Sequence, residues 1–246
     1  MEHSRVKSGI AGLDAMLGGG YAKNSVVAVA GGTGSGRTSF VSQFLVKGAT
    51  DYGEPGLFLS FDEQKNSIYA NMASFGWDMM SLERDHKLVF IEYPQNELAA
   101  FAEQESAIKD LIDSLGIKRV AIDSITPYAL MFSTPEERKL STFKLVSAVK
   151  GWKVTCLISA ETVHGAESAF PHTMSGVESF ADGFIHLSFS RDAGKRSRAI
   201  EIVKMRGSKH EHEIKPLSIT SKGLVVGNPL LSPKPKQKSK AEEDAL

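Results

Sequence analysis

The chain has 246 residues, of which 41% are hydrophobic and 24% are charged, an ordinary globular composition that is long enough to bury one large core. Its 29 lysines and arginines balance 29 aspartates and glutamates, so the chain as a whole has no electrostatic attraction for nucleic acid or an anionic membrane. Any such contact would have to come from a local patch of charge.

The single cysteine, Cys156, lies inside the apolar run VTCLIS, which predicts a buried free thiol and excludes a disulfide framework or a cysteine zinc site. No basic-then-apolar leader opens the sequence, and no apolar run approaches the length of a membrane span. We therefore expect a cytoplasmic protein without membrane contact.

Short apolar, β-branched runs alternate with longer amphipathic segments, which predicts an α/β fold with strand–helix units around a mostly parallel sheet. The expected strands span residues 26–30, 57–61, 88–93, 119–123 and 154–159. One helix is expected over residues 97–115. A second should begin at Thr134, where Pro135 and Glu137 complete a capping box. Its expected apolar face consists of Leu140, Phe143, Val146 and Val149.

After Gly183 the pattern changes to consecutive strands, expected over residues 184–189, 199–205, 214–220 and 223–226 with a turn over 191–198. This predicts an antiparallel C-terminal extension at one edge of the parallel sheet. We expect one domain over residues 1–228. Residues 229–246, rich in proline and lysine, are expected to form a disordered tail because they cannot bury enough apolar surface to fold.

The stretch GGTGSGRT, from Gly31 to Thr38, fits the phosphate-binding loop at every defined position except one, where Arg37 replaces the lysine. It follows an expected strand and opens a helix, as the motif requires. Backbone N–H groups and the helix N-terminus would bind phosphate, and Thr38 would hold magnesium. The predicted contacts are Gly31, Gly32, Thr33, Gly34, Ser35, Gly36, Arg37, Thr38 and Ser39. A glycine-rich turn without a ligand is the alternative.

Carboxylates follow two other expected strands. Asp123 ends RVAID, where it can hold a water of the magnesium shell, and Asp62 and Glu63 follow LFLSF, where a carboxylate can orient an attacking water. Because ligands of open α/β sheets gather at the carboxyl ends of strands, three elements should converge on one crevice. A structural role for Asp123, and a surface turn or helix-terminal charge for Asp62 and Glu63, are the alternatives.

Two basic residues, Lys204 and Arg206, lie two apart on an expected strand, so their side chains should project from the same face. They are too far from the loop in sequence to be placed by pattern, and a solvated basic edge is the default interpretation. His210 and His212 could suggest a metal site. Two histidines at this spacing without further ligands are more typical of a strand-edge pair.

These segments together resemble the KaiC-like ATPases of the RecA superfamily, specifically the short single-domain archaeal and bacterial type. The likeness covers about residues 5–225 and includes RVKSGIAGLDAMLGGG, GGTGSGRT, FLSFDEQ, NMASFGWDM, VAIDSIT, GVESFADGFIHL and KMRGSKH. It implies a RecA-like P-loop NTPase core, ATP or ADP with Mg²⁺ as ligands, and a homo-oligomeric ring, a hexamer, with sites between subunits. Gly31–Thr38 would then be the Walker A loop, Asp123 the Walker B residue, and Glu63, assisted by Asp62, the catalytic carboxylate.

The resemblance also implies that Lys204, Arg206 and His210 reach the nucleotide of the neighbouring subunit, the two basic residues in an arginine-finger role. Ser124 and Glu161, at strand ends near the crevice, could sense the nucleotide or be structural. Loop 164–175 corresponds to a segment that lines a central pore in related proteins, although its sequence favours a plain loop over DNA contact. The clock members' second domain and phosphorylation switch have no basis for transfer to this chain.

Arg37 keeps the charge of the expected lysine but not its shape, because arginine is longer, planar and suited to two-pronged hydrogen bonds. We expect ATP or ADP to bind. The rate of catalysis should be more sensitive to this substitution than binding, since loss of one transition-state donor costs about 100- to 1,000-fold in rate. The leading hypothesis is a slow ATPase that changes the shape of a ring. The alternative is a nucleotide-binding switch or scaffold that hydrolyses little, with an unidentified protein partner. Action on nucleic acid is disfavoured by the neutral charge.

Overall fold

A parallel sheet forms the centre of the computed structural model, which describes residues 4–94, 97–163, 170–192 and 195–227. Its parallel strands, in spatial order, are β9 (Gly183–Asp192), β3 (Val26–Gly31), β7 (Thr155–Val163), β6 (Arg119–Asp123), β4 (Gly56–Ser60) and β5 (Leu88–Glu92). The register sets Gly31 beside Glu161 and Ser60 beside Asp123, so the carboxyl ends of these strands meet at one edge. The predicted α/β class and its parallel core are confirmed.

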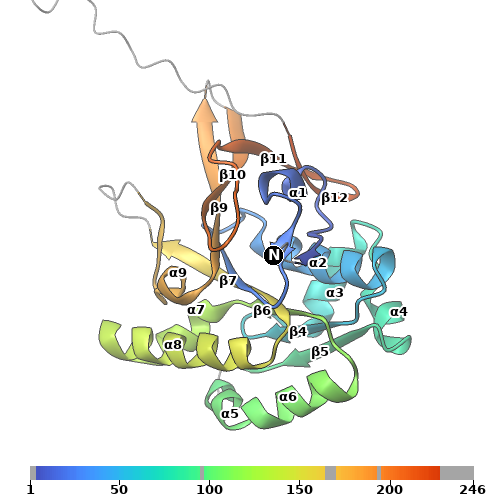
Figure 1. Ribbon diagram of the computed structural model, residues 1–246, viewed down its shortest axis with the longest axis vertical. Coiled ribbons are helices and arrows are strands. Elements are labelled where there is room, and N and C mark those ends of the chain that lie inside the picture. Colours follow the sequence, from blue (N-terminus) through green and yellow to red (C-terminus); the bar gives the residue numbers. More distant parts are fainter. Residues whose placement is uncertain (1–3, 95–96, 164–169, 193–194, 228–246) are drawn as a thin grey trace, which may run out of the picture.

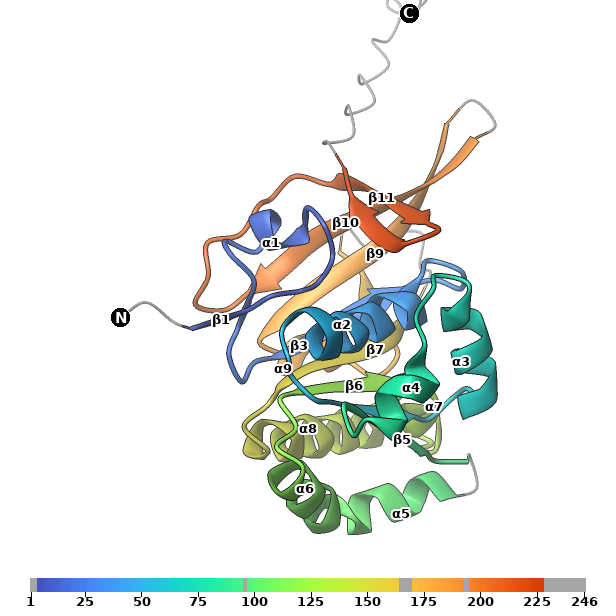
Figure 2. The same cartoon turned by 90° about the vertical axis from the view of Figure 1, so that its right-hand side faces the viewer.

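The C-terminal strands extend this sheet on the β9 side. β10 (Lys195–Met205) pairs antiparallel with β9, followed by β11 (Lys215–Thr220) and β12 (Gly223–Val226), as Figures 1 and 2 show. The predicted antiparallel extension is therefore confirmed. The turn predicted over 191–198 was too long, because β9 continues to Asp192 and β10 starts at Lys195. Outside this path, β1 (Arg5–Val6) pairs with β2 (Tyr21–Ala22), and β8 (His172–Thr173) pairs with β7.

Helices cover both faces of the sheet and give it two separate cores (Figures 1 and 2). One face packs on α1 (Leu13–Met16), α2 (Arg37–Asp51), α3 (Lys65–Ala73) and α4 (Met79–Arg84). The other packs on α5 (Leu98–Glu103), α6 (Glu105–Ser114), α7 (Ile125–Leu130), α8 (Pro135–Gly151) and α9 (Val177–Phe180). Val27 and Val29 of β3 point to the first core while Val26 and Ala28 point to the second, the alternation of a strand buried on both faces.

Two helix predictions needed correction. The helix expected over 97–115 is divided at Gln104 into α5 and α6, and Leu115, which follows α6, is 41% exposed. α8 begins with the predicted capping box, but Leu140 and Phe143 on its expected apolar face are 54% and 49% exposed. A stripe with three-residue spacing rotates around a helix of 3.6 residues per turn. The buried stripe instead follows Thr142, Leu145, Val146 and Val149.

Cys156 is buried in β7 as a free thiol, as predicted, and burial raises the pKa of its Sγ. Among the helices that the structure describes, none combines the length and the apolar character needed to cross a bilayer. The domain boundary at residue 228 stays a prediction, and the proposed tail over 229–246 lies outside the described residues.

A buried arginine joins α2 to β6 at the edge of the sheet opposite the loop GGTGSGRT. Arg119, the first residue of β6, is 1% exposed, and its Nε donates to Glu54 Oε2 at 2.6 Å while its Nη1 donates to the Phe44 carbonyl at 2.8 Å. Its guanidinium lies over the rings of Phe44 and Tyr52. A Cβ at Gly48 of α2 would lie 2.3 Å from Arg119 Cδ, so glycine is required for this approach. These contacts fix the relative position of the two elements that carry Arg37 and Asp123.

Replacing Arg119 by methionine should lower the free energy of unfolding by about 3 kcal/mol, because the substitution leaves the partly buried Glu54 carboxylate unpaired and removes the hydrogen bonds of a fully buried guanidinium. Urea unfolding followed by circular dichroism would measure the change. Arg84→Met, at an exposed arginine of α4, is the matched control and should change stability by about 0.5 kcal/mol or less. A loss for Arg119→Met no larger than that of the control would contradict the anchoring role.

Candidate functional site

The loops at the carboxyl edge of the sheet enclose a cavity of about 410 Å³. It is lined by Gly32, Thr33, Gly34, Ser35, Gly36, Arg37, Thr38, Ser39, Asp62, Glu63, Asp123, Ser124, Glu161 and Ile219. The loop after β3 and the carboxylates after β4 and at the end of β6, all selected from the sequence, therefore lie together. Gly31, the last residue of β3, completes the predicted loop.

The loop before α2 has the features of an anion-binding turn. Gly36 precedes the helix with a φ of 102°, a conformation that favours glycine, and no side chain caps the helix. The N–H groups of the first helical turn are consequently free of intrahelical acceptors and carry the positive end of the helix dipole. The Ser35 hydroxyl, which also lines the cavity, is buried without a hydrogen-bond partner among the described residues. Unpaired donors of this kind fit phosphate oxygens.

Asp123 is the buried acid of the cavity. It is 4% exposed, and its carboxylate accepts a hydrogen bond from the Ser159 hydroxyl, with the Thr38 hydroxyl beside it. Burial raises the pKa of Asp123, while the hydroxyls of Ser159 and Thr38 and the charge of Arg37 act in the opposite direction. The side-chain oxygens of Thr38 and Asp123 are the hard donors that Mg²⁺ prefers, and they already lie in contact.

No group of three or more histidine, cysteine, aspartate or glutamate side chains is placed to hold a metal in the part of the chain that the structure describes. A magnesium ion between Thr38 and Asp123 would therefore take its other ligands from water and phosphate, which is usual for this ion. The oxygen pair fits magnesium bound together with a phosphate ligand, and it does not form a closed site made by protein alone.

Asp62 and Glu63 lie between β4 and α3. Asp62 is exposed, while Glu63 is half-buried and its Oε2 accepts from the Ser67 hydroxyl at 3.1 Å. The Ser60 hydroxyl donates to the Glu63 carbonyl and holds the turn. Both carboxylates line the cavity near Asp123, where either could orient a water molecule. The contact with Ser67, in the first turn of α3, also gives Glu63 a structural partner.

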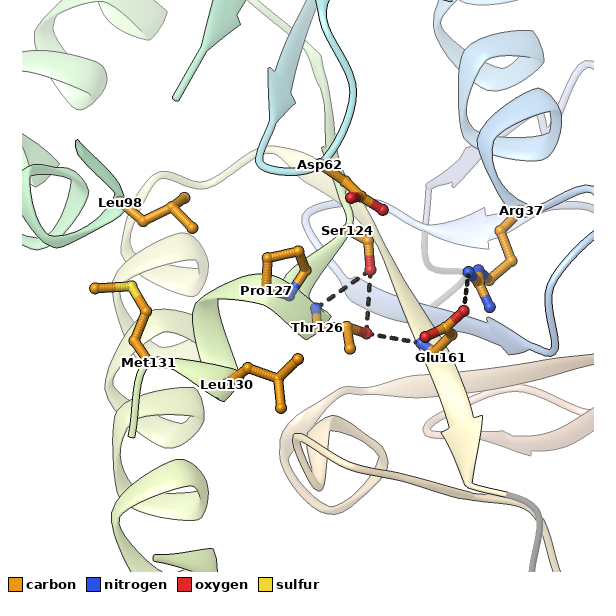
Figure 3. A pocket seen from close by; sticks show the side chains of 9 residues that line it. All are labelled: Arg37, Asp62, Leu98, Ser124, Thr126, Pro127, Leu130, Met131 and Glu161. Carbon is orange, nitrogen blue, oxygen red and sulfur yellow. Dashed lines mark hydrogen bonds and ion pairs between the residues drawn. The ribbon is translucent and has the colours of Figure 1, made fainter. Parts of the chain in front are cut away.

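Arg37 points across the loop rather than into open solvent. Its Nη1 donates to the Gly31 carbonyl, and its Nη2 forms an ion pair with Glu161 Oε1 at 3.3 Å. Figure 3 shows this pair at the polar end of a second cavity, also of about 410 Å³. The remaining lining residues are Asp62, Leu98, Ser124, Thr126, Pro127, Leu130 and Met131, so the far end of this cavity is apolar.

Lys204, Arg206 and His210 are not brought to the cavity by their own chain. Lys204 pairs with Phe184, which pairs with Ala28, three residues before the start of the loop at Gly31 and toward the opposite edge of the sheet. Its Nζ donates to the Glu178 carbonyl at 2.9 Å, and burial lowers the pKa of Lys204. Arg206 follows the end of β10, contrary to the prediction that both lie on the strand.

Arg206 and His210 contact residues outside the lining of the cavity. Arg206 lies 3.7 Å from Asp182, whose carboxylate also pairs with Lys150 at 2.7 Å. The rings of His210 and His212 lie 4.8 Å apart in the segment between β10 and β11, so the predicted strand-edge pair was wrong. Residues 164–169 of the predicted pore loop lie outside the described residues, while β8 occupies 172–173.

Sequence reasoning missed one basic residue that contacts the loop. Arg198 of β10 donates through Nε and Nη2 to the Gly34 carbonyl, at 3.1 and 3.0 Å, and its guanidinium lies over the Phe189 ring. It falls within the stretch that was predicted to be a turn. Only the pairing of Arg198 with Phe189 across the β9–β10 hairpin brings it beside the loop. Nothing in the local sequence marks that register.

Comparison with known proteins decides the family. The model of the KaiC ATPase family matches residues 6–230. The chain belongs to the KaiC-like ATPases. A UPF0273 protein of Methanocaldococcus jannaschii is 33% identical over 236 residues, covering 90% of this chain and 96% of its own length. A solved KaiC-like protein of Pyrococcus horikoshii matches with a TM-score of 0.82 and 32% identity, over 92% of this chain and 100% of that one.

The clock protein is a longer relative of this KaiC-like chain. The circadian clock oscillator protein KaiC of Prochlorococcus marinus is 30% identical over 234 residues, which are 92% of this chain but 45% of the clock protein. The resemblance to the single-domain type is therefore confirmed. The matches establish family and fold, while the role of each residue in the cavity rests on its geometry.

Replacing Asp123 by asparagine should stabilise the ligand-free protein. Because burial raises the pKa of Asp123, folding opposes its ionisation, and the penalty appears as the pH rises above about 4, where an aspartate in the unfolded chain ionises. Asparagine can still accept from Ser159. We expect a gain of about 1 kcal/mol at pH 8 and a smaller one at pH 5.

Urea unfolding without nucleotide at the two pH values would measure these gains. Asp62→Asn is the control, because Asp62 lies exposed at the adjacent strand end and should leave stability within about 0.5 kcal/mol of the starting protein. A loss of stability for Asp123→Asn at pH 8 would show that burial of the charge is not the dominant cost at this position.

Proposed function

We propose that the protein binds magnesium-ATP in the loop cavity and hydrolyses it slowly, as a KaiC-like regulatory ATPase. The observation that carries the proposal is the position of the Thr38 hydroxyl beside the buried Asp123 carboxylate, at the N-terminus of α2, which no side chain caps. Membership in the family supports ATP as the nucleotide. The ring-shaped assembly and the regulatory role are parts of the same proposal.

The residues of the cavity divide into binding and catalytic groups. Backbone N–H groups of the loop and of the first turn of α2 would hold the phosphates, and Thr38 with Asp123 would hold magnesium. Magnesium, when bound, neutralises phosphate charge as it develops. Glu63 would accept the proton of the attacking water with Asp62 assisting, and Arg37 would place its guanidinium on the terminal phosphates.

The cavity is rich in acidic side chains, so binding of a nucleotide there would need additional cations, from magnesium and from a neighbouring copy of the chain. Its lining contains the four carboxylates of Asp62, Glu63, Asp123 and Glu161, but Arg37 is the one basic residue in that lining. A nucleoside triphosphate adds further negative charge, which magnesium offsets only in part. Lys204 and Arg206, remote from their own cavity, are suited to supply charge to the cavity of a neighbouring copy. This imbalance supports a ring, a hexamer by analogy with the family, with sites between subunits.

The alternative function is a nucleotide-binding switch or scaffold that hydrolyses little. One observation favours it: the guanidinium of Arg37 is already engaged by Gly31 and Glu161, so a phosphate that uses the same donors has to displace one of these partners. Binding alone would then suffice to change the state of the ring. Measurement of turnover distinguishes the two functions.

Phosphate release with magnesium-ATP should fall about 100-fold or more in Glu63→Gln, since removal of a positioned base typically costs two to four powers of ten. Arg37→Lys should retain activity or increase it, because lysine restores a mobile point charge at the loop. Glu136→Gln, at an exposed glutamate in the first turn of α8, serves as the control. If the natural sequence releases phosphate no faster than Glu63→Gln while Arg37→Lys gains activity, the protein is a switch rather than an ATPase.

Mixing two inactive variants should restore activity if the sites lie between subunits. Arg206→Ala should lower turnover by about 1,000-fold, as loss of an arginine finger does. In an equal mixture with Glu63→Gln, about a quarter of randomly formed interfaces would combine an intact Glu63 with an intact Arg206. Phosphate release should rise accordingly, and light scattering with and without nucleotide would report the ring. A monomer under both conditions, or no recovery on mixing, would argue against sites between subunits.

A further inference from the structure

We infer that Glu161 competes with the γ-phosphate for the loop and thereby sets the preference of the site between ATP and ADP. The inference rests on the proposed function, because it concerns the regulation of the same nucleotide site. It assigns to one side chain the discrimination between a triphosphate and a diphosphate.

The Glu161 carboxylate occupies donors that belong to the phosphate loop. Its Oε1 accepts from Thr33 Oγ1 at 3.1 Å and from Arg37 Nη2 at 3.3 Å. All three residues line the phosphate cavity. A negatively charged oxygen that is shared by a loop hydroxyl and the loop arginine takes two donors that a phosphate oxygen could use. In this arrangement the chain supplies its own anion to the loop.

The main chain of Glu161 is held in place, so only its side chain can leave. Glu161 pairs with Gly31 in the parallel register of β7 and β3, and its N–H donates to Thr126 Oγ1 at 2.9 Å. Thr126 in turn accepts from the Ser124 hydroxyl, which follows Asp123, as Figure 3 shows. The Glu161 side chain is 45% exposed, whereas that of Arg37 is 14% exposed. Displacement of the carboxylate therefore requires rotation of the Glu161 side chain without movement of the sheet.

The second cavity provides the space for that rotation. Arg37, Asp62, Ser124 and Glu161 line both cavities, so the ion pair stands between the phosphate loop and the half-apolar space beyond it. A carboxylate displaced from Arg37 can turn into this space without a clash with the phosphates. The Arg37–Glu161 ion pair therefore separates the two cavities for as long as it is intact.

Arginine is the residue that makes this competition possible. Its planar fork holds the Gly31 carbonyl through Nη1 and Glu161 through Nη2 at the same time. A lysine offers one ammonium nitrogen on a flexible stem. The departure from the phosphate-loop pattern and the acid on the neighbouring strand therefore act together, and the guanidinium can exchange Glu161 for phosphate while it keeps Gly31.

ATP and ADP should respond differently to this acid. In a phosphate loop the backbone N–H groups cradle the α- and β-phosphates, and the basic side chain reaches the γ-phosphate in the crevice at the carboxyl ends of the strands. The γ-phosphate would meet both the charge of the Glu161 carboxylate and the Arg37 guanidinium that this carboxylate already occupies. ADP lacks the group that competes. Glu161 consequently weakens the binding of ATP more than the binding of ADP.

Glu161→Gln tests the inference, because glutamine keeps the size and the hydrogen-bond acceptor but removes the charge. Calorimetric titration would use magnesium-ADP and the magnesium complex of adenylyl imidodiphosphate, a triphosphate analogue that resists hydrolysis. The affinity for the analogue should rise about tenfold, while the affinity for ADP should change by less than about threefold. Glu136→Gln should leave both affinities unchanged.

The ratio of the two affinities is the decisive quantity, since a merely structural role of Glu161 would weaken both nucleotides together. Glu161→Ala provides a second variant without the charge, and thermal unfolding identifies any variant that fails to fold. If a folded variant binds both nucleotides with the unchanged ratio, the inference is wrong and the proposed function stands. If the unaltered protein binds neither nucleotide, the proposed function fails first, and the inference fails with it.

Discussion

The parallel register of β3, β7, β6 and β4 is the constraint on which the candidate site depends. It sets Gly31 beside Glu161 and Ser60 beside Asp123, so the loop and the acids from distant parts of the sequence emerge at one edge. Side chains alternate between the two faces of a strand, and a slip of one residue in β6 would turn Asp123 away from Thr38. Because both faces of these strands are buried, the two cores oppose any such slip.

The sequence predicted this edge well because its determinants are local. The strands β3, β4, β5 and β6 are short apolar runs that end in a glycine or a polar residue, and their predicted limits differ from those observed by one residue or less. β7, predicted over 154–159, continues four residues further to Val163. The break at Gln104, the buried stripe of α8 and the contact of Arg198 with Gly34 depend on neighbours distant in sequence. The periodicity of each segment does not specify these three features. They are set by tertiary packing, which the local sequence pattern does not reveal.

The phosphate cavity concentrates acidic side chains, which is electrostatically unfavourable. Asp123 is buried against its preference for water, and three more carboxylates line the same cavity. At the opposite end of β6, Arg119 is buried with a carboxylate, a carbonyl and two aromatic rings as partners. The same strand therefore begins at a charge that is paired with an opposite charge and ends at an acid whose burial raises its pKa. Such a contrast is expected of a protein whose stability is maintained away from its functional edge.

Arg37 changes how the loop is interpreted. Considered alone, the replacement of lysine indicates a weakened phosphate site, but the structure shows that the guanidinium has two partners, Gly31 and Glu161, that one ammonium group could not hold in the same geometry. A phosphate that takes the Nη2 donor now bound to Glu161 has to displace that carboxylate. The altered residue therefore bears less on whether a phosphate can bind than on which phosphate can displace an acid that the chain itself provides. A slow ATPase and a nucleotide switch would then share the same architecture of the site. They would differ in the equilibrium by which a phosphate replaces Glu161 at Arg37.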